Sequence, residues 1–217
     1  MEPAATVYAR LPFDQLVEQL AARTPTPGGG TGAALAGALG AALGCMALRF
    51  SLGKKGGPGE HDAVLGEIER GLLAAAAQLS RLADEDAAAF EAVRSARKLP
   101  QGTEAEKAAR AAAVAAANDH SAAVPLQTAK SCREAMECLD GALAVLNTRL
   151  ATDAGSGALL LRAGARCAAW NVLVNLVGDG SAAAAARRAE VARLLARAAE
   201  LETRIVAWTD AALQAGG

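Results

Sequence analysis

The sequence has few aromatic residues. Only 3% of its 217 residues are Phe, Trp or Tyr, although hydrophobic residues make up 53% of the chain. Sheets draw on aromatic and β-branched residues for cross-strand pairs, and no segment alternates apolar and polar residues for the length of a strand. Ala, Leu and Gly dominate instead, which favours closely packed helices. We therefore expect an all-α fold in which residues 1–217 form a single-domain helical bundle with a central, buried helix rich in Gly and Ala.

A large net charge and a metal-binding pattern are also lacking. The 22 basic and 23 acidic residues leave a net charge of −1, so we expect no nucleic-acid partner. The two histidines and four cysteines show no zinc-ligand spacing, and we expect no metal site. The cysteines are interpreted as free, buried thiols in a reducing compartment.

Residues 24–48 contain no charged residue and are long enough to span a bilayer. Their Ala and Gly content makes them only weakly hydrophobic, however, and the charged residues Arg10, Asp14, Glu18 and Arg23 before them do not resemble a signal peptide. We therefore expect a buried central helix here, with no membrane partner and no targeting segment. A cytoplasmic location is the resulting expectation.

Apolar periodicity, together with the positions of Gly and Pro, predicts the helices. These cover residues 12–20, 32–50, 61–99, 104–120, 126–146, 153–176 and 181–213, with approximate ends. Gly40 and Gly44 lie one turn apart and predict that the helix over 32–50 approaches its neighbours closely. Pro125 predicts an interruption, because proline lacks the N–H that a helix interior needs.

A turn rich in Pro and Gly, residues 24–31, leads into the predicted helix over 32–50. A helix N-terminus carries unpaired N–H groups and partial positive charge, and glycines let a ligand approach the backbone closely. The turn therefore predicts a site for a carboxylate, a phosphate or a polar ring edge; the alternative is a simple connection. The Gly-Lys-Ser/Thr ending of a nucleotide-binding loop is missing, and no strand precedes the turn.

Several segments, spread over almost the whole chain, resemble the formiminotransferase-cyclodeaminase C-terminal family, also called the cyclodeaminase/cyclohydrolase family. They occur in the family's order and are Pro27-Gly28-Gly29-Gly30-Thr31 with the Gly/Ala helix after it, Gly53-Lys54-Lys55, Asp86-Ala87-Ala88-Ala89-Phe90 with Leu99-Pro100, Glu106-Lys107-Ala108-Ala109-Arg110, Val124-Pro125-Leu126, Asn147 with Thr152-Asp153-Ala154-Gly155, and Asn171-Val172 with Asn175. The sequence departs from the family pattern at Gln101, Leu146 and Thr152, where lysine, glycine and serine are common.

The resemblance implies an all-helical homodimer that transforms a one-carbon unit on tetrahydrofolate, with no cofactor beyond that substrate. In the cyclohydrolase reaction, water opens methenyltetrahydrofolate to formyltetrahydrofolate; in the cyclodeaminase reaction, formiminotetrahydrofolate cyclises and releases ammonia. Both need proton transfer beside a changing positive charge, which suits a carboxylate. Methenyltetrahydrofolate cyclohydrolase activity is preferred, because the sequence holds no formiminotransferase segment. Formiminotetrahydrofolate cyclodeaminase activity and a noncatalytic folate-binding helical dimer stay open.

The resemblance also implies catalytic roles for Asp86, Asp153 and Lys54. Asp86 lies beside Asp84 and Glu85, so a solvated acidic helix face is the alternative. Asp153 precedes an apolar run, and it or Thr152 could instead cap a helix. Lys54, with Lys55, could belong to a solvated loop.

Substrate binding is the role that the resemblance implies for a larger set: Pro27, Gly28, Gly29, Gly30, Thr31, Lys55, Lys107, Arg110, Thr152, Asn171 and Asn175. Lys107 and Arg110 could bind the glutamate tail of folate or be ordinary surface charges. Asn171 and Asn175 lie one turn apart on an apolar helix, so their amides either bond across the core or bind the pterin ring.

Overall fold

The structure is a computed structural model that describes residues 7–52 and 60–216, apart from the side chains of residues 60–62. Its elements are the 3-10 helix η1 (Tyr8–Arg10), α1 (Phe13–Ala21), α2 (Gly29–Arg49), α3 (Glu60–Arg97), α4 (Glu104–Ala142), the 3-10 helix η2 (Thr148–Leu150), α5 (Ala151–Asn175) and α6 (Ala182–Gln214). Within the described ranges there is no strand, and the predicted all-α fold is confirmed.

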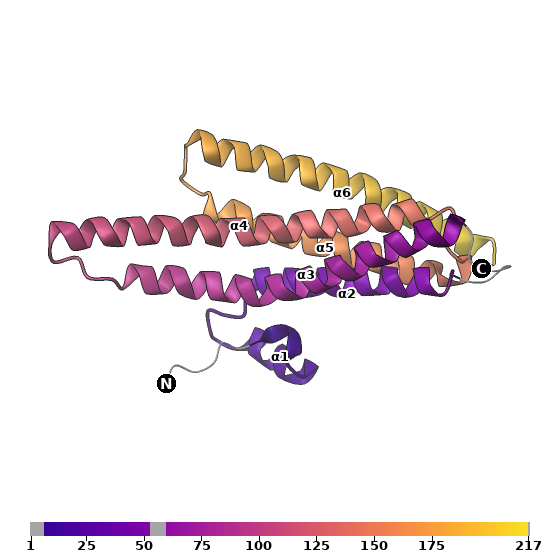
Figure 1. Ribbon diagram of the computed structural model, residues 1–217, viewed down its shortest axis with the longest axis horizontal. Helices are drawn as coiled ribbons and strands as arrows, with labels where there is room; N and C mark the ends of the chain where they lie inside the picture. The colour runs from indigo at the N-terminus through magenta and orange to yellow at the C-terminus, as the bar shows by residue number, and fades with distance from the viewer. Residues whose placement is uncertain (1–6, 53–59, 217) are drawn as a thin grey trace.

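The long helices α2 to α6 form one elongated bundle (Figure 1). α2 packs against both α3 and α5, and α3 and α4 form a hairpin whose tip projects beyond the other helices. α6 lies along α4 and α5, whereas α1 stands apart below the bundle in Figure 1. A hollow of about 440 Å³ separates α1 from α2 and α3.

α2 and α5 run antiparallel and touch backbone to backbone. A Cβ atom at Gly40 would lie 2.6 Å from the carbonyl oxygen of Gly157 and 2.8 Å from the amide nitrogen of Leu161. A Cβ atom at Gly157 would meet the Gly40 carbonyl at 2.8 Å, and one at Gly164 would meet the Ala33 carbonyl at 2.8 Å. The contact therefore requires glycine, as the small residues of this helix predicted.

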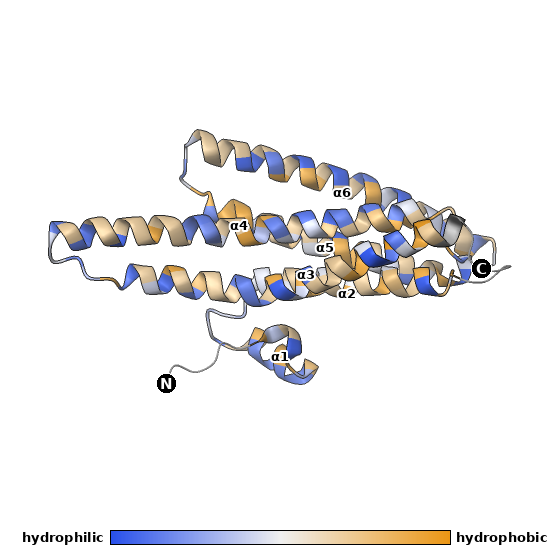
Figure 2. Ribbon diagram, in the orientation of Figure 1, coloured by the Kyte–Doolittle hydropathy of each residue, from blue (hydrophilic) through white to orange (hydrophobic). Residues whose placement is uncertain are grey.

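α2 is the central helix that the sequence predicted. Among the described residues, α2 is the one helix long and apolar enough to cross a membrane. More than half of its most apolar stretch is buried inside the bundle, however. Apolar residues cover most of α2 in Figure 2, whereas hydrophilic residues recur along α4 and α6. Its Leu48 is fully buried with Leu72 and Leu79 of α3 and Leu161 of α5, so α2 contributes to the core from several sides.

The predicted helix boundaries agree with the structure to within a few residues, with one exception at Pro125. The interruption predicted there is wrong, because α4 continues through Pro125 as a single helix of 39 residues. α2 begins at Gly29, so the last two glycines of the triple-glycine turn already belong to its first turn. The predicted loop over residues 51–60 lies largely outside the described residues.

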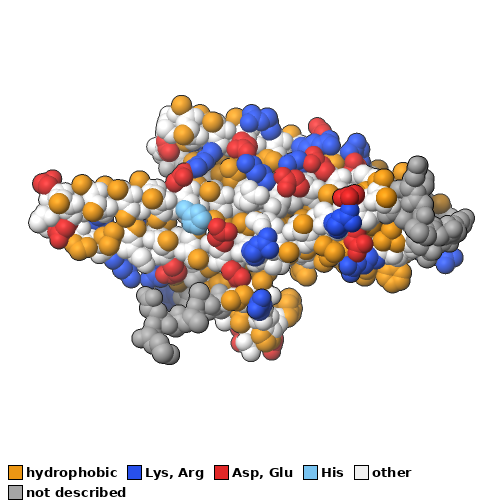
Figure 3. All heavy atoms as spheres, in the orientation of Figure 1, with side chains coloured by type: hydrophobic (Ala, Val, Ile, Leu, Met, Phe, Trp, Pro, Cys, Tyr) orange, Lys and Arg blue, Asp and Glu red, His pale blue; other side chains and the backbone are white. Residues whose placement is uncertain are grey.

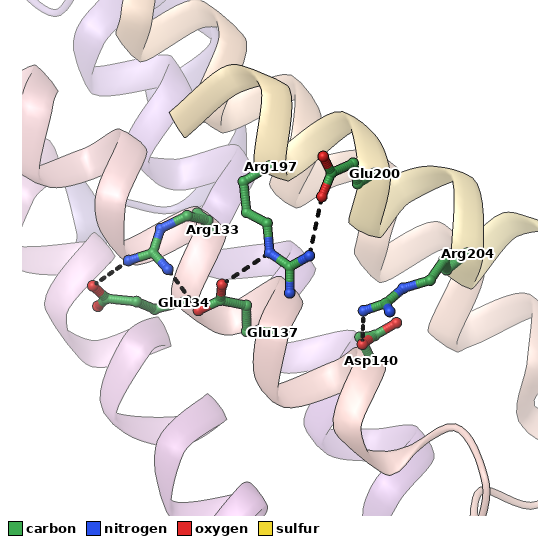
Figure 4. A network of polar contacts seen from close by, with 7 residues as sticks. All are labelled: Arg133, Glu134, Glu137, Asp140, Arg197, Glu200 and Arg204. Carbon is green, nitrogen blue, oxygen red and sulfur yellow. Dashed lines mark hydrogen bonds and ion pairs between the residues drawn. The ribbon is translucent and has the colours of Figure 1, made fainter. Parts of the chain in front are cut away.

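Ion pairs connect α4 and α6. Lys130 of α4 pairs with Glu190 of α6 at 2.7 Å, and Glu137 pairs with Arg197 at 3.2 Å. Figure 4 shows Glu137 between Arg133 and Arg197, and it shows Arg204 of α6 beside Asp140 of α4. Basic and acidic side chains are interspersed on this face of the molecule (Figure 3), so polar contacts hold α6 along one of its sides.

Gly40→Ala should destabilise the protein, because the added methyl group meets backbone atoms that cannot rotate away. We expect a loss of about 1–3 kcal/mol in the free energy of unfolding, measured by urea denaturation. Gly141→Ala is the matched control: position 141 is exposed on α4 with no atom within 4 Å of an added Cβ, and alanine there should be neutral or stabilising. Equal stability of the Gly40 variant and wild type would contradict the packing described.

Candidate active site

A pocket of about 220 Å³ lies where the start of α2, the middle of α3, the middle of α4 and the end of α5 meet. Six of the residues predicted from the sequence line it, although they come from three separate segments. They are Gly28, Gly29, Gly30, Asp86, Asn171 and Asn175. The pocket therefore combines a carboxylate, two amides and an exposed stretch of backbone.

Asp86 lies directly on the first turn of α2. A Cβ atom at Gly30 would lie 2.1 Å from Oδ1 of Asp86, so only glycine leaves room for the carboxylate. The hydroxyl of Thr31 donates a hydrogen bond to Oδ2 at 3.1 Å. The N-cap residue of α2 is Gly28, which has no side chain to accept from the free N–H groups of the first turn. Asp86 thus supplies from α3 the acceptor that α2 lacks.

The environment of Asp86 changes its acidity. Burial raises the pKa of the Asp86 carboxyl above its ordinary value, and the hydroxyl and backbone N–H of Thr31 partly oppose this effect. A carboxylate whose pKa moves toward neutrality is a better proton acceptor than an ordinary aspartate. The solvated acidic face that was the alternative for Asp86 is wrong, since its carboxylate lies in the pocket wall.

Asn175 supplies a hydrogen bond that Pro125 cannot make within α4. In a regular helix the N–H of residue 125 would bind the carbonyl oxygen of Ser121, but proline has no N–H. Nδ2 of Asn175 donates to that carbonyl oxygen at 3.2 Å instead. A side chain of α5 thereby lets α4 continue, which explains why the predicted interruption does not occur.

Asn171 is held in a similar way, through a hydrogen bond from its Nδ2 to the carbonyl oxygen of Cys167 at 2.9 Å. It lies against Gly29, where an added Cβ would be 3.6 Å from Nδ2. Each amide therefore donates one N–H to a backbone carbonyl oxygen. Among the hydrogen bonds of the described residues, none involves Oδ1 of either asparagine, so both oxygens remain acceptors at the pocket.

Sequence reasoning missed several residues of the pocket wall: Pro25, Thr26, Phe90, Ser121, Pro125 and Val174. A signal existed for Phe90, which lies four residues after Asp86 and so shares its helix face. Val174 had a similar signal, because it lies three residues after Asn171 and so shares its helix face. Ser121 had no such signal: its carbonyl oxygen lacks a partner within α4 only because residue 125 is a proline.

Other predicted residues do not reach this pocket within the chain. Asp153 and Thr152 lie in the first turn of α5, and Asp153 is about 27 Å from Asn171 along the helix at 1.5 Å per residue. The helix-capping role that was the alternative for these residues is wrong for both, since the N-cap position is Leu150. Pro27 and Thr31 are buried beside the pocket and do not line it.

The basic residues are also distant or not described. Lys107 pairs with Glu104 at 2.7 Å, near the tip of the α3–α4 hairpin. Arg110 donates to Oε1 of Gln101 at 2.8 Å and to the carbonyl oxygen of Arg97, in the same region. Both therefore act as surface contacts of the hairpin. Lys54 and Lys55 lie outside the described residues, and their predicted roles stay predictions.

Together, the bundle and its pocket define an all-helical protein with a carboxylate placed over a glycine-rich helix start. The sequence model of the formiminotransferase-cyclodeaminase family matches residues 12–193. The chain belongs to this family, as the resemblance predicted.

Individual relatives support the same grouping. The chain is 38% identical over 194 residues to a methenyltetrahydrofolate cyclohydrolase of Methylorubrum extorquens, covering 89% of this chain and 93% of that protein. It is 35% identical to the formimidoyltransferase-cyclodeaminase of Sus scrofa, of which it spans only 30%. The crystal structure of a formiminotetrahydrofolate cyclodeaminase from Thermotoga maritima matches with a TM-score of 0.81 at 26% identity, covering 94% of this chain and 98% of that chain.

Asn175→Ala should cost about 0.5–1.5 kcal/mol of unfolding free energy, because it removes the partner of the Ser121 carbonyl. The same substitution in a Pro125→Ala background should cost close to nothing, since the restored N–H of residue 125 can bind that carbonyl. Urea denaturation of the four proteins measures this coupling. Equal costs in the two backgrounds would show that Asn175 does not compensate for the proline.

Proposed function

We propose that this chain is a methenyltetrahydrofolate cyclohydrolase whose general base is Asp86. The observation that carries the proposal is the partly buried Asp86 carboxylate in the wall of a polar pocket, held at Oδ2 by Thr31. The Methylorubrum extorquens relative is a methenyltetrahydrofolate cyclohydrolase and the chain covers it almost completely, which supports the same reaction. A carboxylate also suits a substrate whose reacting carbon is cationic.

The pocket fits one end of a folate. Its volume of about 220 Å³ is below the several hundred Å³ typical of sites for whole drug-sized ligands, so the pterin end enters and the glutamate tail stays outside. The free Oδ1 atoms of Asn171 and Asn175 can accept from pterin N–H groups. Phe90, which is 40% exposed, offers its ring to the bicyclic system.

In the proposed reaction, Asp86 takes a proton from a water molecule while the water oxygen bonds to the methenyl carbon. The protonated Asp86 then returns this proton to the folate nitrogen whose bond to that carbon breaks. The second proton of the water leaves to solvent as the formyl C=O bond forms. One water is consumed and one proton is released, which balances the lost positive charge of the substrate, and the step draws only on folate, water and the side chain.

Formiminotetrahydrofolate cyclodeaminase activity is the second candidate, a lyase reaction, and the structural similarity to the Thermotoga maritima enzyme favours it. There Asp86 would give a proton to the departing ammonia. Two assays separate the candidates: loss of the methenyltetrahydrofolate absorbance, and release of ammonia from formiminotetrahydrofolate. Folate binding with turnover of neither substrate would instead identify a noncatalytic folate-binding protein.

Asp86→Asn should lower kcat by at least about 100-fold, because the amide keeps the acceptor for Thr31 but cannot carry the proton.

In the wild-type protein, kcat/KM should fall as the pH drops through the pKa of Asp86, since protonation removes the base. Burial raises that pKa, so this acidic limb should lie above the ordinary value of 3.8. Initial rates between pH 4 and 8, corrected for the uncatalysed reaction, measure both effects.

Glu85→Gln is the control for Asp86→Asn, because Glu85 is the adjacent acid on α3 and lies outside the pocket wall. It should leave the rate and its pH profile unchanged. Wild-type activity in the Asp86→Asn variant would refute the proposed base.

We also propose that the protein is a homodimer formed through the outer face of α5. This face exposes large apolar side chains of α5 that nothing covers in the single chain: Leu159 (51% exposed), Trp170 (58%) and Val174 (63%). Uncovered apolar surface of this kind is typical of interfaces. We propose a cytoplasmic location too, on the basis of the four free cysteine thiols.

The charges of α5 favour a second copy as the occupant of this face. In an antiparallel pair of α5 helices that cross near Leu159, the small residue Ser156 faces the partner's Ala163, and Asp153 faces the partner's Arg166. Arg166 is five residues from Asn171, roughly 7.5 Å along the helix. The proposed dimer thus brings an Asp153 toward each pocket, so its catalytic role stays a proposal.

Leu159→Glu should convert the dimer into a monomer, because the charge would be buried at the crossing point of two helices. Analytical ultracentrifugation measures the change in mass. The matched control is Leu99→Glu, at an exposed leucine (41%) beyond the end of α3 and far from this face. A wild-type monomer, or a Leu159→Glu variant that stays dimeric, would count against this interface.

A further inference from the structure

Thr31 donates its hydroxyl hydrogen bond to a side chain, whereas four other helical hydroxyl groups donate to backbone carbonyl oxygens, Thr209 also to that of Ala151 on α5. Ser80, Thr128, Thr203 and Thr209 each donate to the carbonyl oxygen four residues earlier in their own helix. Thr31 instead donates to Oδ2 of Asp86, 55 residues away on another helix. The position explains the difference, because Thr31 lies in the first turn of α2 and residue 27 precedes the helix.

Burial removes Thr31 from direct contact with a ligand. The residue is 0% exposed and is not part of the pocket wall, although its neighbours Gly29 and Gly30 are. A buried hydroxyl needs an acceptor, and Asp86 supplies it. The resemblance implied that Thr31 binds substrate; the structure buries it outside the pocket wall, in hydrogen-bond contact with the carboxylate.

We infer that Thr31 is the positioning residue of Asp86: its hydroxyl fixes Oδ2 and thereby the orientation of the carboxylate in the pocket wall. The inference rests on the proposed function, which makes Asp86 the base. The torsion that turns an aspartate carboxylate is soft, so a fixed orientation needs a partner. Thr31 supplies that partner, and Gly30 supplies the space, because any Cβ there would overlap Oδ1.

The same hydrogen bond also influences the pKa of the base. The hydroxyl of Thr31 lowers the pKa of Asp86, against the larger effect of burial. Without the hydroxyl, burial would raise the pKa of Asp86 with less compensation. The pKa should therefore increase, and a larger fraction of the Asp86 carboxyl groups should be protonated near neutral pH. A residue that only fills space would not change this property.

Thr31→Val and Thr31→Ser test the inference, because valine keeps the shape of threonine without the hydroxyl and serine keeps the hydroxyl. We expect Thr31→Val to lower kcat roughly 10- to 100-fold, the loss typical of a hydrogen bond to a charged group. KM should stay within about twofold, and the acidic limb of the pH profile should move to higher pH. Thr31→Ser should restore both kcat and the limb. A raised KM with an unmoved limb would support substrate binding and overturn the positioning role.

A second measurement does not depend on turnover. The 13C carboxyl resonance of Asp86, identified by its loss in Asp86→Asn, can be titrated by NMR in each protein. The pKa should rise in Thr31→Val and stay near the wild-type value in Thr31→Ser; equal pKa values in all three would overturn the inference. If wild type turns over neither folate, the proposed function fails while this titration still decides the role of Thr31. Should Thr31→Val not fold, the smaller Thr31→Ala gives the same comparison.

Discussion

The backbone contact between α2 and α5 is the constraint on which the rest of the structure depends. Gly40 and Gly157 face each other so closely that neither helix can slide without a clash of carbonyl oxygens. This contact fixes the antiparallel register of the two helices, which then sets Gly29 beside Asn171 at the pocket end. Small residues in the middle of the bundle thus determine which groups meet about three to four turns away.

Asp86 combines two demands that oppose each other. As the acceptor at the start of α2, it should be ionised, because the free N–H groups and partial positive charge of a helix start favour an anion. As a partly buried group, it loses hydration, which raises its pKa and makes ionisation costly. A carboxylate under both influences can accept and release a proton with little rearrangement, which acid–base catalysis requires.

The sequence predicted the local features well, because they depend on neighbours in the chain. Within the described residues, the periodicity located the α-helices to within a few residues, except that it divided α4 at Pro125, and the triple-glycine turn pointed to the start of α2 as part of a site. The same reasoning failed at Pro125, where the compensating group is Asn175, fifty residues later. The sequence also grouped Asp86 with Asp153, because a motif does not show at which end of a 25-residue helix a residue lies; the two acids lie apart within one chain, and the proposed dimer brings them closer.

The ion pairs between α4 and α6 have a consequence for how the chain finds its register. Lys130–Glu190 and Glu137–Arg197 have opposite polarity and lie seven residues apart on both helices. If α6 moved by seven residues in one direction, Lys130 would face Arg197; in the other direction, Glu137 would face Glu190. Exposed ion pairs contribute little net stability, but both misaligned arrangements bring like charges together. The two pairs therefore discriminate against heptad-shifted alternatives, a specificity that the alanine-rich surface of α6 could not provide by shape alone.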